Sequence, residues 1–197
     1  MNVFISGGCK NGKSYYAQGI AKKMSSEQGV PLYYVATMIP GDEEDQARIA
    51  RHIRERAGWG FTTIEQGRNI CEALDECIAL TPKPQGEALF LGNEPEAACC
   101  RGVFLLDSVT ALLSNEMFLP GGEFNPGAGA KVARDLLEFA ARTGSTVFVS
   151  DYIYSDSRIF DSYTEDYRRA LACIDRALAR ECDQVVEVAY GNKYFYK

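Results

Sequence analysis

The sequence predicts an α/β protein with three layers, in which a mostly parallel β-sheet lies between helices. Short apolar runs alternate with segments of helical periodicity along the whole chain, which is typical of βα units. A hydrophobic content of 46% excludes a disordered chain. The 197 residues suit one domain of ordinary size and are too few for two. We therefore predict a single domain over residues 1–197, with an antiparallel strand at one edge of the sheet.

The predicted strands are short apolar runs, most of them bounded by glycine, proline or polar residues. The first precedes a glycine-rich segment, residues 7–12, and Pro31 precedes the second. The runs cover residues 3–6, 32–36, 61–64, 102–107, 146–150 and 185–189, with residues 193–196 as the expected edge strand.

The predicted helices follow from apolar residues that recur at helical spacing. They cover residues 13–27, 42–57, 69–80, 108–118, 131–142 and 163–182. The expected buried faces are Tyr16, Ile20 and Met24 in the first helix and Leu171, Ile174 and Leu178 in the last. Acidic residues at 42–45 complement the N-terminus of the second helix. Residues 81–101 and 120–129 are rich in glycine and proline, and we expect surface loops there.

The composition argues against several kinds of partner and site. The net charge of −6 makes nucleic acid an unfavourable partner. No stretch approaches the roughly 18 apolar residues of a membrane helix, and the first residues do not resemble a signal peptide. Seven cysteines without a CxxC pair, and a single histidine, argue against a zinc cluster and favour reduced, mostly buried thiols. We therefore expect a soluble cytoplasmic protein.

Residues 7–14 match the phosphate-loop motif GxxxxGK[ST] completely, between the first strand and the first helix. In such a loop, backbone N–H groups and the helix N-terminus surround the β-phosphate of a nucleotide. Lys13 should reach the β and γ oxygens, and Ser14 should bind Mg²⁺. The predicted nucleotide-binding residues of the loop are Gly7, Gly8, Cys9, Lys10, Asn11, Gly12, Lys13 and Ser14. The alternative is a glycine-rich turn that only links strand to helix.

Asp107 ends an apolar run at the edge of the predicted sheet where ligands bind. A phosphate loop needs a carboxylate there to hold its metal, so we predict that Asp107 binds Mg²⁺ with Ser14 and serves catalysis. The alternative is a cap for the helix that begins near Ser108, and both roles are compatible. Asp151 also ends a strand, and it is a candidate proton acceptor, metal ligand or helix cap.

Arg48, His52 and Arg56 are four residues apart on the second predicted helix and therefore share one stripe. Guanidinium groups on both sides disfavour a protonated imidazole and can bind a triphosphate in bidentate fashion. His52 is thus a candidate nucleophile toward an α-phosphate. Ile49 and Ile53 should pack on another face. The alternative is a charged helix with one solvated histidine, which is the commoner meaning of such a pattern.

Several segments together resemble the bifunctional adenosylcobinamide kinase/adenosylcobinamide-phosphate guanylyltransferase family of cobalamin biosynthesis. They are GGCKNGKS, YYVAT, DEEDQARIARH with Trp59 and TTIE downstream, and VFLLDSVTALLSNEMF. The resemblance covers residues 1 to about 118, and it resumes at the helix with Tyr167, Arg168 and Arg169 and at residues 185–188. Its most specific part is Arg-Ile-x-x-His after Tyr-x-Ala-Thr.

The resemblance implies two reactions in sequence. ATP or GTP phosphorylates the aminopropanol hydroxyl of adenosylcobinamide, and GMP is then transferred from GTP to that phosphate, which yields adenosylcobinamide-GDP. It also implies that His52 carries the guanylyl group as a covalent intermediate. Family members are similar to RecA-like P-loop folds and commonly form trimers, with the histidine helix near a subunit boundary. We therefore expect a homo-oligomer.

The sequence departs from the family pattern at three places, and other functions stay open. Residues 150–154 replace an Asn-Glu-Val-Gly segment, residues 82–101 are an insertion, and Lys10 replaces a frequent arginine. The corrinoid contacts are therefore undefined. A P-loop kinase of another small molecule would transfer phosphate without a GMP adduct. A nucleotide-sensing module, with residues 120–129 as a switch, would turn over slowly and ignore cobinamide.

Overall fold

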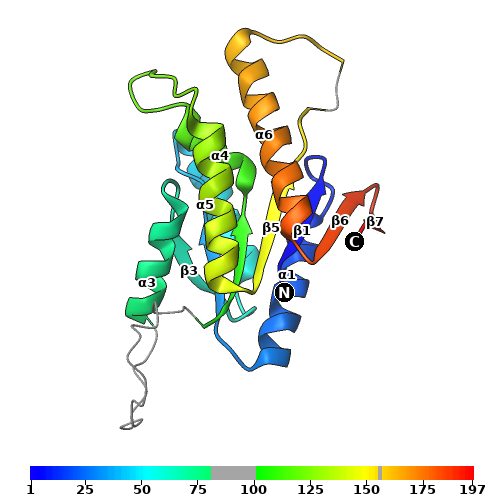
Figure 1. The fold of residues 1–197 in the computed structure, drawn as a ribbon. Coiled ribbons are helices and arrows are strands. Elements are labelled where there is room, and N and C mark those ends of the chain that lie inside the picture. The colour runs from blue at the N-terminus through cyan, green and yellow to red at the C-terminus, as the bar shows by residue number, and fades with distance from the viewer. Residues whose placement is uncertain (81–100, 155–156) are drawn as a thin grey trace, which may run out of the picture.

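The computed structural model describes residues 1–80, 101–154 and 157–197, which contain a sheet of seven strands in the order β3-β2-β4-β5-β1-β6-β7 (Figure 1). The strands are β1 (Val3–Gly7), β2 (Leu32–Ala36), β3 (Thr62–Glu65), β4 (Val103–Asp107), β5 (Thr146–Asp151), β6 (Gln184–Ala189) and β7 (Asn192–Phe195). Neighbouring strands are parallel except for the edge pair β6–β7. The predicted α/β class, mostly parallel with an antiparallel edge strand, is confirmed.

Helices cover both faces of the sheet, so the predicted three layers are present. The helix α1 lies on one face, while α3, α4, α5 and α6 contribute to the core on the other. Their bounds, with that of α2, are α1 (Lys13–Gln28), α2 (Glu43–Arg56), α3 (Ala73–Leu80), α4 (Val109–Met117), α5 (Ala128–Thr143) and α6 (Ser162–Glu181). The insertion predicted over residues 82–101 lies almost entirely outside the described residues.

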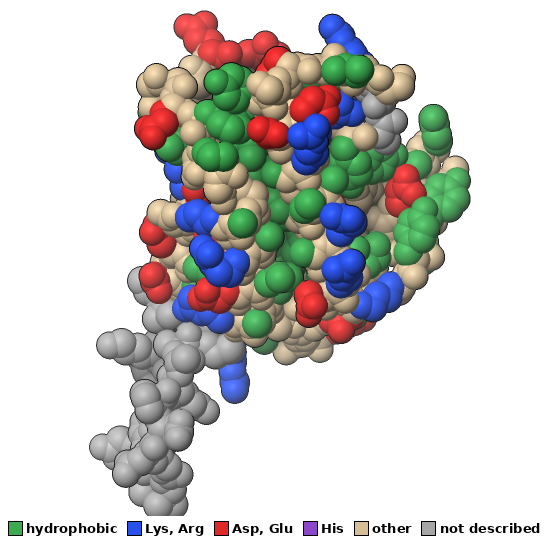
Figure 2. All heavy atoms as spheres, turned by 45° about the horizontal axis from the view of Figure 1, so that its top comes forward, with side chains coloured by type: hydrophobic (Ala, Val, Ile, Leu, Met, Phe, Trp, Pro, Cys, Tyr) green, Lys and Arg blue, Asp and Glu red, His purple; other side chains and the backbone are tan. Residues whose placement is uncertain are grey.

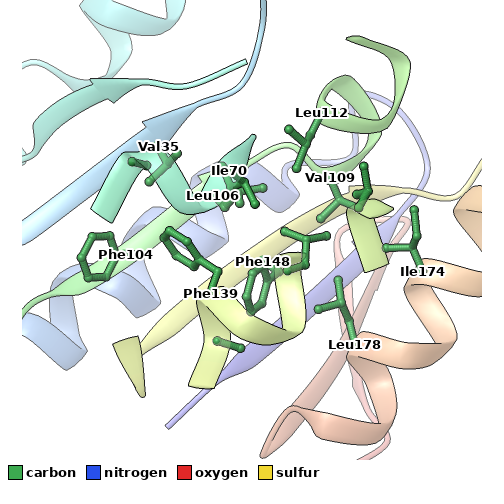
Figure 3. Close-up of a cluster of buried hydrophobic side chains, with 14 of the residues drawn as sticks. Val35, Ile70, Phe104, Leu106, Val109, Leu112, Phe139, Phe148, Ile174 and Leu178 are labelled. Atoms are coloured by element: carbon green, nitrogen blue, oxygen red, sulfur yellow. The ribbon is translucent and has the colours of Figure 1, made fainter. Parts of the chain in front are cut away.

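The central strands are buried on both faces because successive side chains point to opposite sides of a strand. On β4, Val103 and Leu105 face α1, whereas Phe104 and Leu106 face the other helix layer. Phe104 stacks on Tyr33 with ring centroids 5.0 Å apart. It also meets Phe139 of α5 edge-on at 5.5 Å (Figure 3). This burial fixes the strand ends, from which the site residues project.

The buried face of α1 differs from the prediction. Ala17, Ala21 and Met24 are buried, whereas Tyr16 and Ile20 are only partly buried at its margin. Small alanine side chains let the helix approach the sheet closely, and the larger residues then lie beside the contact. The predicted apolar face of α6 is confirmed, since Leu171, Ile174 and Leu178 are all buried.

Two helix starts also differ from the prediction. The segment expected to be one helix over residues 69–80 begins as a 3₁₀ turn, Ile70–Glu72, because Asn69 has a left-handed φ of 47°. The helix α5 begins three residues earlier than expected, and the side chain of Asn125 accepts a hydrogen bond of 3.0 Å from the N–H of Gly127 just before it. Local backbone geometry therefore sets both starts.

The described cysteines differ in exposure, and Cys71 is only partly buried. Cys77 and Cys182 are buried as predicted, whereas Cys9 and Cys173 are exposed, so the expectation of mostly buried thiols is wrong for these two. Cys99 and Cys100 lie outside the described residues. None of the helices in the described part of the chain has the length and apolarity needed to cross a lipid bilayer.

The β6–β7 hairpin forms an aromatic edge of the molecule. Large hydrophobic side chains stand at the right margin of Figure 2, where Figure 1 places this hairpin. The exposed aromatic residues of the segment are Tyr190, Tyr194, Phe195 and Tyr196.

We expect replacement of Gly7 by alanine to lower the free energy of unfolding by about 1–3 kcal/mol, the range typical of overpacking. A Cβ atom at Gly7 would overlap the carbonyl oxygen of Val188 and the side-chain amide of Asn11. Gly19 of α1 is the matched control, because a Cβ atom there meets nothing within 4 Å. Gly19→Ala should raise stability by about 0.5–1 kcal/mol. Urea unfolding measures both, and a Gly7→Ala variant as stable as the wild type would contradict the packing of the loop.

Asp175 on α6 is a buried carboxylate, only 3% exposed, and the hydroxyl of Tyr154 donates to its Oδ2 at 2.9 Å. Burial raises the pKa of Asp175 to about 6. The ordinary value is about 3.9, so between pH 4 and 6 the folded state binds more protons than the unfolded state, and stability falls as pH rises.

Asp175→Asn removes this titration and keeps the size and one acceptor oxygen. We expect the difference in free energy of unfolding, variant minus wild type, to rise by about 1–3 kcal/mol from pH 4 to pH 8. Urea unfolding at both pH values gives this difference. An unchanged difference between variant and wild type across this pH interval would show that Asp175 does not titrate there.

Candidate active site

Most of the predicted site residues meet in a cavity of about 630 Å³ at the carboxyl ends of the strands. The phosphate loop, α2, α4 and the ends of β2, β4 and β5 all contribute to its wall. A cavity of this volume suits a nucleotide-sized ligand. The predicted residues that line it are Cys9, Lys10, Lys13, Ser14, Arg48, His52, Arg56 and Asp107.

Asn11 and the glycines shape the phosphate loop. The side-chain amide of Asn11 donates to the carbonyl oxygen of Val188 on β6, and its Oδ1 accepts a bond of 3.3 Å from the N–H of Lys13. Gly12 has a left-handed φ of 86° directly before α1, which favours glycine. Gly7, Gly8, Asn11 and Gly12 are not among the residues that line the cavity, and their contact with a nucleotide stays a prediction.

Lys13 is the most deeply placed cation of the loop, with 6% exposure. Its ammonium group donates to the carbonyl oxygen of Gly8 at 3.1 Å and forms an ion pair with Asp151 at the end of β5. Asp151 is not a helix cap, because Asp161 caps α6. Its carboxylate instead faces the phosphate loop as the counter-ion of Lys13.

Asp107 ends β4 and lines the same cavity as Ser14. The side chain of Ser108, and not that of Asp107, caps α4, so the helix-cap alternative for Asp107 is wrong. The hydroxyl of Tyr34 donates to Oδ2 of Asp107 at 3.0 Å. Carboxylate and hydroxyl oxygens are donors that Mg²⁺ prefers. The pair Ser14 and Asp107 therefore fits the predicted metal.

Tyr34 is buried beneath the cavity and remains a neutral donor. Burial raises its pKa well above the ordinary value, and the negative charge of Asp107 adds to this, while Arg56 acts in the opposite direction. Tyr34 therefore keeps its proton and its bond to Asp107 across the physiological range.

The helix α2 brings His52 to the cavity. Asp42 caps it by accepting a bond of 2.8 Å from the N–H of Asp45, and acidic residues occupy its first turn. His52 is half-buried and lines the cavity with Lys13. The prediction that Ile53 packs is wrong, because its side chain is 51% exposed.

The two arginines of the predicted stripe differ in their surroundings. Arg48 is exposed and pairs with Asp45 at 3.7 Å. Arg56 is only 8% exposed, and its guanidinium carbon lies 3.6 Å from the ring centroid of Tyr34. Arg56 thus contacts the sheet at Tyr34, and it also lines the cavity.

Sequence reasoning did not identify Tyr34, Thr110 or Tyr167 as part of the site. Thr110 accepts a bond of 2.8 Å from the N–H of Asp151, and its carbonyl oxygen accepts one of 2.8 Å from the hydroxyl of Tyr167. All three line the cavity. Each of them lies in a predicted strand or helix, where its residue type is expected for structural reasons. The sequence therefore gave no indication that it lines the site.

Residues 3–83 match a family model described as cobinamide kinase / cobinamide phosphate guanyltransferase. The bifunctional adenosylcobalamin biosynthesis protein CobP of Pseudomonas aeruginosa is 33% identical over 116 residues, which are 58% of this chain and 52% of that protein. The protein CobU of Escherichia coli K12, with the same description, is 29% identical over 126 residues, or 64% and 55%. These matches confirm the predicted family resemblance. The chain spans about half the length of these relatives.

Solved structures show a more distant likeness. The ATPase domain of G40P has a TM-score of 0.49 and 13% identity, and the match covers 94% of this chain and 68% of that one. The KaiC-like protein PH0186 of Pyrococcus horikoshii OT3 has a TM-score of 0.49 and 14% identity, over 100% of this chain and 78% of that one.

Proposed function

We propose that this chain is a bifunctional transferase that phosphorylates adenosylcobinamide and then transfers GMP from GTP to the new phosphate. The observation that carries the proposal is that the phosphate-loop residues Lys13 and Ser14 line the same cavity as Asp107 and His52. The first pair suits phosphoryl transfer, and a histidine in the same cavity suits nucleotidyl transfer. The family match over residues 3–83 supports the corrinoid as the acceptor.

In the first reaction, Lys13 exchanges its partner Asp151 for the β and γ oxygens of ATP or GTP. The hydroxyl oxygen of the acceptor bonds to the γ-phosphorus, the bond from that phosphorus to the bridging oxygen breaks, and the nucleoside diphosphate leaves. Asp151, released from Lys13, takes the hydroxyl proton. The charge of Lys13 stabilises the transferring phosphoryl group more than the ground state.

Ser14 and Asp107 would hold Mg²⁺ in this site. When bound, the metal neutralises charge on the phosphate oxygens.

In the second reaction, an imidazole nitrogen of His52 bonds to the α-phosphorus of GTP and pyrophosphate leaves. An oxygen of the corrinoid phosphate then bonds to the same phosphorus, the phosphorus–nitrogen bond breaks, and adenosylcobinamide-GDP forms. Two easier displacements thus replace one difficult displacement. We propose that Arg48, which is exposed and lines the cavity with His52, binds the triphosphate. We also propose a homo-oligomer, as the family resemblance implies.

Transfer of two different labels tests this function. The protein is incubated with adenosylcobinamide, Mg²⁺ and GTP labelled at either the α or the γ position, and the corrinoids are separated by chromatography. The proposal predicts that both labels enter the corrinoid product. Transfer of the γ label alone would reduce the function to a kinase, and transfer of neither label to the corrinoid would contradict the proposal.

A further inference from the structure

Arg56 is the side chain that fixes the helix α2 to the rest of the molecule. Of the α2 side chains that the structure describes, only Arg56 is buried. Its guanidinium group stacks on the ring of Tyr34 and donates to Oγ1 of Thr63 on β3 at 3.4 Å. His52 lies one helical turn before this anchor, so the place of Arg56 determines the place of His52.

Tyr34, on which Arg56 stacks, also contacts the end of the cavity where Mg²⁺ would bind. The ring of Tyr34 is held edge-on by Phe61, with centroids 5.7 Å apart. The hydroxyl at the far end of the same ring donates to Oδ2 of Asp107 at 3.0 Å. One rigid aromatic side chain therefore contacts both the guanidinium group that holds α2 and the carboxylate that would hold Mg²⁺.

We infer that Arg56 and Tyr34 are positioning residues for guanylyl transfer, which hold the His52 helix in register with Asp107 and the phosphate loop. The inference rests on the proposed function. It assigns to Arg56 a role different from the triphosphate ligand that the sequence predicts, because its guanidinium group is stacked on Tyr34 and donates to Thr63 in this structure. Arg56 should therefore control the rate of attack by His52 and leave the affinity for GTP unchanged.

Arg56→Lys is the decisive variant, because it keeps the charge and loses the planar group that stacks on Tyr34. Arg54→Lys is the matched control on the same helix, since Arg54 is exposed and does not line the cavity. Tyr34→Phe is the second variant, which keeps the ring and removes only the bond to Asp107.

Three quantities are measured for each variant. They are the single-turnover rate at which the His52 adduct forms from α-labelled GTP, the Kd for GTP by equilibrium dialysis, and kinase turnover. For Arg56→Lys we expect the adduct rate to fall by about tenfold or more, as loss of a buried cation–π contact implies. The Kd and kinase turnover should stay within about threefold. Tyr34→Phe keeps the ring that contacts Arg56 and removes only the bond to Asp107, so it should lower the adduct rate and kinase turnover together. Arg54→Lys should change nothing.

Hydrogen exchange of the α2 amides gives a readout without turnover. Exchange should be faster in Arg56→Lys than in Arg54→Lys, because the helix has lost its anchor. Unchanged exchange, an unchanged adduct rate, or a Kd for GTP that rises in step with the lost rate would overturn the inference. If the wild type forms no adduct, the proposed function fails, while the exchange experiment still decides whether Arg56 anchors the helix.

Discussion

Replacement of Lys13 by alanine should lower phosphoryl transfer from the nucleotide by about two orders of magnitude or more, the cost of losing one preorganised charge at a transferring group. Lys13 is buried in the loop between the carbonyl oxygen of Gly8 and the carboxylate of Asp151. The variant loses the cation that the γ-phosphate would bind, and it leaves Asp151 facing the phosphates with no counter-ion. Steady-state kinase turnover with γ-labelled ATP measures the effect.

Lys23→Ala provides the control for a lost lysine on the same helix. Lys23 is on the exposed side of α1, where it pairs with Glu27 at 3.7 Å, so turnover should match the wild type. A Lys13→Ala variant with near-normal kinase rates would refute the role of the loop.

Replacement of His52 by alanine should abolish covalent labelling of the protein by α-labelled GTP, while kinase turnover stays within about threefold of the wild type. The two effects separate because His52 is on α2, whereas the kinase residues are on the loop and on the strand ends. Labelling is read by gel autoradiography after denaturation. A phosphoramidate adduct is labile in acid and stable in alkali, so this treatment identifies the bond.

Arg54→Lys serves again as the control for a change on α2. It should be labelled as fully as the wild type. Undiminished labelling of His52→Ala would reject His52 as the nucleophile, and equal loss of kinase and labelling would assign His52 a structural role.

The sequence predicts those features of the fold and the site that depend on the pattern of residues within one short segment. Apolar runs located the central strands β1, β2, β4 and β5 to within a few residues, since strands buried on both faces leave a continuous apolar signal. The spacing of the phosphate loop placed Lys13 and Ser14, and a carboxylate at the end of a parallel strand placed Asp107. Each of these depends on residues close together in the chain.

The features that could not be predicted depend on contacts between distant segments. The pair of Lys13 and Asp151 joins residues 138 positions apart. The stack of Arg56 on Tyr34 requires knowledge of which side of α2 faces β2, and a helix of mixed charge does not specify this side. For the same reason the sequence overestimated the burial of Ile53 and did not reveal the contact of Arg56 with Tyr34.

A crystal structure with a non-hydrolysable GTP analogue and Mg²⁺ tests the central claim most directly. The account predicts that the β and γ phosphates lie within residues 7–14 and that the ammonium group of Lys13 has moved from Asp151 to a phosphate oxygen. If the analogue binds elsewhere while Lys13 keeps its pair with Asp151, the account is contradicted.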